Sequence, residues 1–69
     1  MTAIVETPYR GYQIAIREEA GRFTPRITRE GARVEHDGRS SDVWAGASCG
    51  SYERALERAC NAIRTGRVR

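Results

Sequence analysis

The spacing of apolar residues changes once along this chain, and that change limits the possible folds more than any other feature of the sequence. From Tyr12 to Ile16 an apolar residue recurs at every second position, which is the period of a strand with one buried face. From Tyr52 to about Thr65 the apolar residues recur three and four positions apart, which is the period of a helical stripe. This stripe consists of Tyr52, Ala55, Leu56, Ala59, Cys60 and Ile63. The sequence therefore predicts strands first and one amphipathic helix after them.

Both ends of the expected helix carry residues that favour a helix terminus. Ser51 is a good N-cap, and Glu53 lies in the first turn, where the helix dipole favours an anion. Arg64 lies in the last turn, and Gly66 can adopt the left-handed conformation that ends a helix. These signals predict a helix that begins after Ser51 and ends at about Thr65.

A second strand is expected from Arg22 to Thr28, after a hairpin-like turn at Glu18–Gly21. Pro25 lies in the middle of this strand and has no N–H group to donate to a neighbouring strand. We therefore expect the strand to lie at an edge of the sheet or to be broken at Pro25.

The remaining strand segments are short. Glu30-Gly31 and Asp37-Gly38 bracket a segment around Val34, and residues 42–48 form the last expected strand. Because sequential strands with short connections favour antiparallel pairing, we expect an α+β fold, with a three- to four-stranded antiparallel sheet and the C-terminal helix packed on one face (β-β-β-α). The expected core comprises Tyr12, Ile14, Ile16, Phe23, Ile27 and Val34 against Leu56, Ala59 and Ile63.

The length of the chain predicts one small domain over residues 1–69. A chain of this size buries only about 60% of the surface that its unfolded form exposes, so we expect a thin core. Residues 1–8 and 67–69 lack clear periodicity, and we expect them to be flexible.

All of the basic residues are arginines: the chain has twelve of them, no lysine, and a net charge of +3. Arginine binds phosphate or carboxylate in a bidentate manner, so selection for an acidic partner explains this bias. Codon usage in a GC-rich genome explains it as well, because the chain is also rich in alanine and glycine. We attribute the total to codon usage, so only the placement of the arginines indicates function.

Two groups of arginines are candidate binding residues. If the expected core residues of the strands point toward the helix, the residues that alternate with them form the outer sheet face. That face then carries Gln13 and the candidate partner-binding residues Arg17, Arg22, Arg26, Arg33 and Trp44. Trp44 has a second interpretation, because a small domain with few large residues can need it in the core. A second group near the end of the sequence, a possible nucleic-acid contact, comprises Arg64, Arg67 and Arg69.

The residue types that support catalysis or metal binding are scarce. Cys49, just before the helix, and His36, the single histidine, form the one pair that could act as a nucleophile and base. A structural explanation is better for both: Cys49 is a small residue before the helix cap, and His36 is a polar residue next to a turn. One histidine with Cys49 and Cys60 does not make a zinc ligand pattern. Cys60 lies along the helix, about 15 Å from Cys49, so free thiols are expected. We expect no enzyme activity, metal or cofactor.

The segment Gly50–Ala59 resembles the helix entry of HicB-type antitoxin domains, in which a glycine, a Ser or Thr cap, an acidic residue and an Ala-Leu step follow three strands. The expected β-β-β-α order is also similar to the double-stranded RNA-binding domain without its first helix. The size and the opening Val5–Pro8 resemble small phage-encoded inhibitors such as anti-CRISPR proteins. The first and last resemblances imply an inhibitory binding protein.

These observations predict a non-enzymatic phage or bacterial protein that acts as a stoichiometric inhibitor or regulator of a larger protein or protein–nucleic-acid machine. The alternative is a small basic module that binds nucleic acid directly. A homodimer is plausible, because a thin core and an edge strand favour self-association. No apolar run approaches the roughly 20 residues that cross a bilayer, and residues 1–6 lack the layout of a signal peptide. We therefore expect no membrane partner and a cytoplasmic location.

Overall fold

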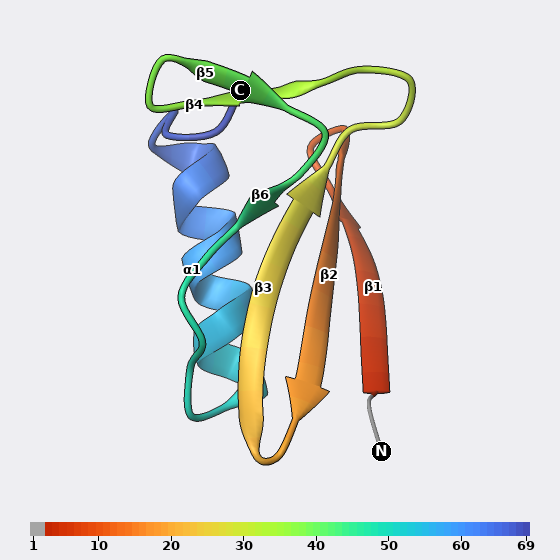
Figure 1. Ribbon diagram of the computed structural model, residues 1–69, viewed down its shortest axis with the longest axis vertical. Helices are drawn as coiled ribbons and strands as arrows, with labels where there is room; N and C mark the ends of the chain where they lie inside the picture. Colours follow the sequence, from red (N-terminus) through yellow and green to blue (C-terminus); the bar gives the residue numbers. More distant parts are fainter. Residues whose placement is uncertain (1–2) are drawn as a thin grey trace.

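A computed structural model describes residues 3–69 as an antiparallel sheet with one helix packed on one of its faces (Figure 1). The sheet has the strand order β1-β2-β3-β6, and α1 follows it in the chain. The strands are β1 (Ala3–Tyr9), β2 (Tyr12–Glu19), β3 (Arg22–Thr28) and β6 (Trp44–Ala45), and the helix is α1 (Tyr52–Arg64). The predicted α+β class and the position of the helix are confirmed.

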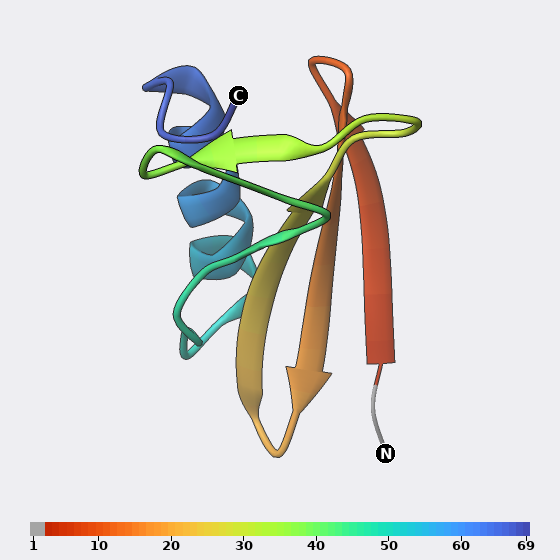
Figure 2. The same cartoon turned by 45° about the horizontal axis from the view of Figure 1, so that its top comes forward.

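A second, two-stranded sheet lies at one end of the molecule. It pairs β4 (Val34–His36) with β5 (Arg39–Ser41), and it lies next to the C-terminal part of α1, in front of it in the view of Figure 2. Val34 is fully buried, so this small sheet closes one end of the core.

Three hairpins of the fold use the same two-residue turn. The turns are Arg10-Gly11, Ala20-Gly21 and Asp37-Gly38. Both residues of each turn have positive φ, which is the type I′ geometry that matches the twist of paired strands. The flanking residues pair directly, so each turn sets the register of the strands that it joins.

The segment 1–8, for which flexibility and no strand are expected, forms a strand in the part of it that the structure describes. Residues 3–8 belong to β1, which pairs with β2 along its whole length, whereas residues 1 and 2 lie outside the described residues. β1 has a weak apolar pattern, because Glu6 and Pro8 interrupt it. The signal that could have revealed it is the Arg10-Gly11 pair, a hairpin turn placed directly between two tyrosines.

The segment after the helix also differs from the predicted flexible tail. Gly66 has a φ of 77°, which turns the chain back, and Val68 is only 1% exposed. The Val68 N–H donates to the Ala62 carbonyl at 3.1 Å. Arg69 then exchanges backbone hydrogen bonds of 2.9 and 2.7 Å with Glu35 of β4. Residues 67–69 therefore fasten the end of the helix to the small sheet.

Pro25 does not break β3, because its missing N–H would have pointed away from β2. Glu19 and Arg22 flank a two-residue turn and so exchange backbone hydrogen bonds. The backbone N–H and C=O groups of Arg22 and of every second residue after it therefore point toward β2. Pro25 faces the other side of β3, where its carbonyl accepts a hydrogen bond from the Gly46 N–H at 2.9 Å. β3 thus pairs with β2 over its full length and only briefly with β6.

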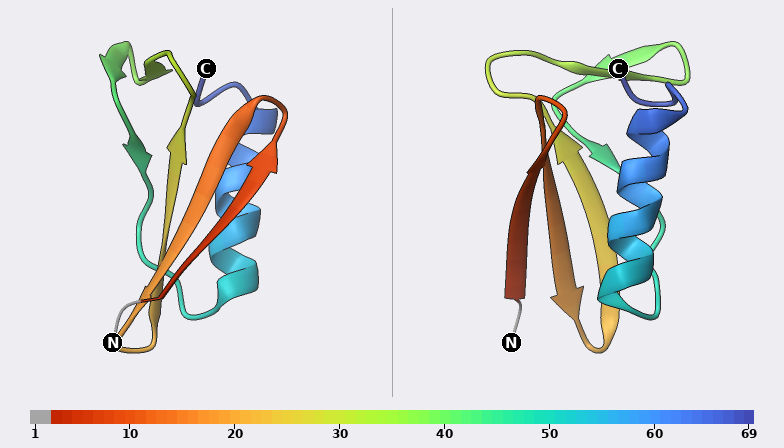
Figure 3. Two further views of the ribbon diagram at one scale, coloured as in Figure 1. Left: turned by 90° about the vertical axis from the view of Figure 1, so that its right-hand side faces the viewer. Right: turned by 180° about the vertical axis from the view of Figure 1, so that it is seen from behind.

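The core lies between the helix and strands β2 and β3 (Figure 3). Ile14, Ile16 and Ile27 are at most 1% exposed, and small alanines on the buried face of α1 let the helix approach the sheet closely. The predicted core is confirmed for Ile14, Ile16, Ile27, Val34, Ala59 and Ile63, whereas Tyr12, Phe23 and Leu56 are half-buried at its rim.

Gly46 is expected to tolerate no side chain. A Cβ atom at this position would lie 2.7 Å from Cη2 of Trp44 and 3.0 Å from Cγ of Pro25. Gly46→Ala should therefore lower the free energy of unfolding by about 1–3 kcal/mol, measured by urea denaturation. Gly50→Ala is the control, because a Cβ there meets no atom within 4 Å, and it should change stability by less than about 1 kcal/mol. Equal effects of the two substitutions would contradict this packing.

Val68 tests whether the segment after α1 is part of the core. Val68→Ala should cost about 1–3 kcal/mol of unfolding free energy, because it removes fully buried methyl groups. Arg67→Ala changes the exposed neighbour and should stay within about 0.5 kcal/mol of the parent. A negligible effect of Val68→Ala in the same urea titration would mean that the segment does not pack.

Candidate binding surface on the open sheet face

The sheet face opposite α1 brings three of the predicted arginines together. Arg17 on β2 lies opposite Thr24 on β3, and Thr24 is flanked along its strand by Arg22 and Arg26 on the same face. Diagonal cross-strand neighbours lie about 7–8 Å apart, so Arg17 is within reach of both other arginines. We call this set of Arg17, Arg22 and Arg26 the arginine triad. It borders a shallow hollow of about 260 Å³ together with Glu19, Ala20 and Thr24.

The three arginines differ in how they are held. Arg17 pairs with Glu19 at 3.2 Å, and both side chains are about half-exposed, so the pair is weak. Arg22 reaches across to the segment before α1, where its Nη2 donates to Ser48 Oγ at 3.0 Å. Arg26 is exposed and makes no side-chain hydrogen bond or ion pair within residues 3–69. Arg26 is therefore the member of the triad that is free to bind an external acidic group.

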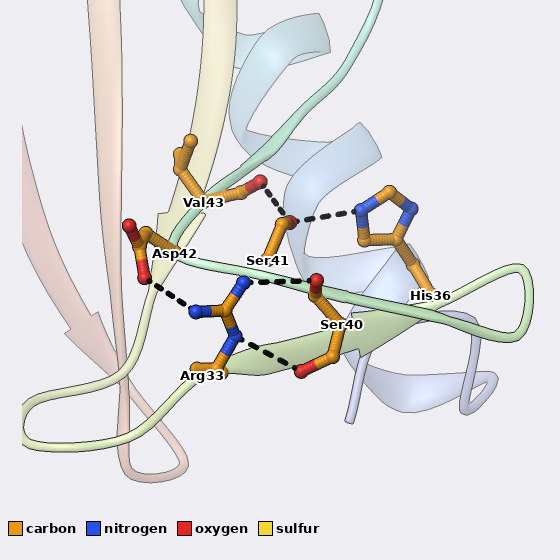
Figure 4. Close-up of polar contacts among 6 residues, drawn as sticks. All are labelled: Arg33, His36, Ser40, Ser41, Asp42 and Val43. Carbon is orange, nitrogen blue, oxygen red and sulfur yellow. Dashed lines mark hydrogen bonds and ion pairs between the residues drawn. The ribbon is translucent and has the colours of Figure 1, made fainter.

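The other two predicted residues of the outer face lie elsewhere. Arg33 precedes β4, where its Nη1 lies 3.5 Å from Asp42 and its Nε donates to Ser40 Oγ at 3.2 Å (Figure 4). Trp44 lies opposite Ile27 in the β3–β6 pairing, so it points to the helix side of the sheet and is half-buried. Trp44 therefore does not belong to the open face but lies at the rim of the core, and Ala45 takes the outward position beside Arg26.

The arginines near the end of the sequence also separate. Arg67 and Arg69 line a hollow of about 380 Å³ beside the β4–β5 turn, and Arg39 lies there too, a residue that the sequence did not single out. Glu35 and Asp37 line the same hollow and offset part of its charge. Arg64 instead stays on the helix, where its Nη2 donates to Asn61 Oδ1 at 2.9 Å.

A chain of Asp37, His36 and Ser41 has the residue types of a hydrolase triad. His36 Nε2 lies 3.3 Å from Ser41 Oγ (Figure 4). The Nδ1 atom of His36 lies 3.8 Å from Asp37. However, Ser41 Oγ donates its hydrogen to the Val43 carbonyl at 2.8 Å, so Nε2 must be the donor to Ser41. A base that donates to the hydroxyl cannot remove its proton, and this arrangement does not activate Ser41.

The two cysteines are unpaired and sit in different surroundings. Cys49 is 5% exposed and exchanges backbone hydrogen bonds with Phe23, and its Sγ donates to the Ala47 carbonyl at 3.6 Å. Cys60 is half-buried on the flank of the helix. Within residues 3–69 no hydrogen bond joins Cys49 to His36, and no group of three acidic, histidine or cysteine side chains is placed to hold a metal ion.

Comparison with known proteins adds no assignment: no family model, no curated protein and no solved structure matches this chain. No helix within the described residues is both long and apolar enough to cross a membrane. The candidate site therefore depends on its geometry and charge alone.

The burial of the two cysteines predicts their reactivity. In the folded protein a thiol reagent should modify Cys60 before Cys49, because reaction at a buried thiol requires local opening. The measurement is mass spectrometry of the labelled peptides over time, and the control is labelling in denaturant, where the two rates should become similar. Faster labelling of Cys49 in the folded state would instead identify an activated thiol.

Proposed function

We propose that this protein is a non-enzymatic binding protein, which docks its arginine triad against an acidic surface of a larger protein or protein–nucleic-acid complex and thereby inhibits or regulates it stoichiometrically. The observation that carries this proposal is the presence of three arginines on adjacent strands, on a sheet face that α1 leaves uncovered. Their alternation with the buried residues of β2 and β3 keeps all three on that face.

The charge balance of the open face supports an acidic partner. The register of β1 places Glu6 on this face beside Ala15, and Glu19 lies at the end of β2. The open face thus carries two carboxylates and the three guanidinium groups of the triad, so its net charge is positive. Such an excess accelerates encounter with an acidic surface and disfavours basic ones.

The backbone positions of the triad are held in place, which supports binding. Two tight turns hold β1, β2 and β3 in one register, and the Arg22 side chain is further held by Ser48. A side chain that is ordered before binding loses less conformational entropy on binding, and arginine is enriched among residues that dominate interface energies. Arg26 then supplies the free bidentate donor group.

Charge reversal in the triad tests this proposal. Arg26→Glu should weaken partner capture by about 2 kcal/mol or more, roughly thirtyfold in Kd, without loss of stability, because the exposed Arg26 side chain makes no hydrogen bond or ion pair within residues 3–69. The matched control is Arg58→Glu, which makes the same change of charge at an exposed position in the middle of the helix, where the side chain likewise makes no hydrogen bond or ion pair within residues 3–69. Quantitative proteomics of lysate captured on the parent and both variants should reveal a partner that the control retains and Arg26→Glu loses. Identical capture by all three proteins would contradict the proposal.

Direct binding to nucleic acid is the second candidate function. The specific observation that favours it is the hollow lined by Arg39, Arg67 and Arg69, which adds a second basic region to the triad. Phosphate contacts predict that affinity for RNA or DNA falls steeply with salt. Fluorescence anisotropy with single-stranded RNA and duplex DNA at low and physiological salt separates the two functions, because the docking proposal predicts no binding to either nucleic acid at physiological salt.

A further inference from the structure

The exposed apolar residues of this protein are concentrated on one strand. Within residues 3–69 the exposed large hydrophobic side chains are Ile4, 62% exposed, and Val5, 48% exposed. Both belong to β1, the outermost strand of the sheet, which has β2 on one side and no strand from the described part of the chain on the other. An open edge with apolar side chains is the part of a sheet most prone to pair with another strand.

The hairpin geometry determines which backbone groups of β1 face this open edge. Tyr9 and Tyr12 flank the two-residue turn and so exchange hydrogen bonds, and Thr7 and Val5 follow at alternate positions with bonds to β2. The N–H and C=O groups of Ile4 and Glu6 therefore point outward. Pro8 also points outward, but it offers only a carbonyl.

The helix leaves the approach to this edge free. α1 packs on β2 and β3 and does not extend over the edge formed by β1 (Figure 3). Val5 lies opposite Ile16 and shares its side of the sheet, yet Val5 is half-exposed while Ile16 is 1% exposed. On the inner side of β1, Tyr9 next to the turn packs against the core, whereas Val5 is left uncovered.

We propose that β1 pairs antiparallel with β1 of a second copy of this chain, with Val5 on the two-fold axis. In this register Ile4 lies opposite Glu6 of the second copy, and Glu6 lies opposite its Ile4. All four residues have outward N–H and C=O groups, so both pairs can exchange two ladder hydrogen bonds. The two Val5 side chains meet in the closely spaced, non-hydrogen-bonded pair at the centre, which covers the exposed valine.

The other symmetric registers are less favourable. A pairing centred on Glu6 would oppose two carboxylates and would place Ile4 opposite Pro8, which has no N–H to give. A pairing centred on Thr7 would place Glu6 opposite Pro8 in both halves and lose a donor in each. A pairing centred on Ile4 would place each Val5 opposite Ala3, so the two exposed valines would not cover each other. Charge and proline chemistry thus disfavour the registers centred on Glu6 and Thr7, and the mutual covering of Val5 favours the register centred on Val5 over the one centred on Ile4.

The proposed dimer would have one continuous sheet made from two copies. Because Val5 faces its symmetry mate on the same side, the two-fold axis is perpendicular to the sheet. Both helices would then lie on one face, and both arginine triads on the other. The pairing itself does not depend on the function of the triads.

Cysteine cross-linking tests both the dimer and its register. In a Cys60→Ser background, Val5→Cys should form a disulfide-linked dimer under mild oxidation, because residues in such a central pair have Cα atoms about 4.5 Å apart. Thr7→Cys is the matched control on the same side of the same strand. Its two copies would be offset by four residues, about 13 Å, which exceeds the roughly 7 Å limit for a disulfide. Non-reducing electrophoresis measures both.

Sedimentation equilibrium of the unmodified protein completes the test. We expect a species of twice the 7.7 kDa chain mass, and Val5→Arg should return it to the monomer because it opposes two cations at the axis. Circular dichroism of Val5→Arg should stay unchanged, since the side chain is half-exposed in the monomer. A monomer at every concentration would overturn the proposal, and so would cross-linking through Thr7→Cys in place of Val5→Cys.

Discussion

Strand register is the constraint on which the rest of this structure depends, and three two-residue turns impose it. Each turn places a residue other than glycine at positive φ, at Arg10, Ala20 and Asp37, a conformation that such residues adopt only at some energetic cost. A shift by one residue would move Ile14 and Ile16 to the solvent side and bring Arg17 into the core. The buried isoleucines and the arginine triad are therefore two consequences of the same turns.

The small core is closed at one end by two short segments. The buried face of α1 is mostly alanine, so the large side chains come from the strands. Val34 of β4 and Val68 after the helix cover one end, and backbone bonds between Glu35 and Arg69 join these two segments. Because so short a chain buries little apolar surface, the burial of Val68 by the segment that folds back after the helix is a substantial part of the core.

Much of the fold was predictable because it depends on local patterns. The helix follows from a stripe with an N-cap at Ser51 and a left-handed stop at Gly66, and its boundaries agree with the structure. β1 was not predicted, because Glu6 and Pro8 weaken its alternation and its pairing partner supplies the stability. The effect of Pro25 was also not predictable, since it depends on which side of β3 the missing N–H would face.

The sequence by itself determined the strands-then-helix order, the parity that places Arg17, Arg22 and Arg26 on one face, and the scarcity of catalytic residues. These properties depend on period, capping and composition, which neighbouring residues set. Only the tertiary structure decided that Trp44 faces the helix side, that Arg33 is held by Ser40 and Asp42, and that β1 presents an open edge. Those outcomes depend on how chain segments distant in sequence pack together, and a one-residue change of phase in a short strand such as β6 reverses the direction of its side chains.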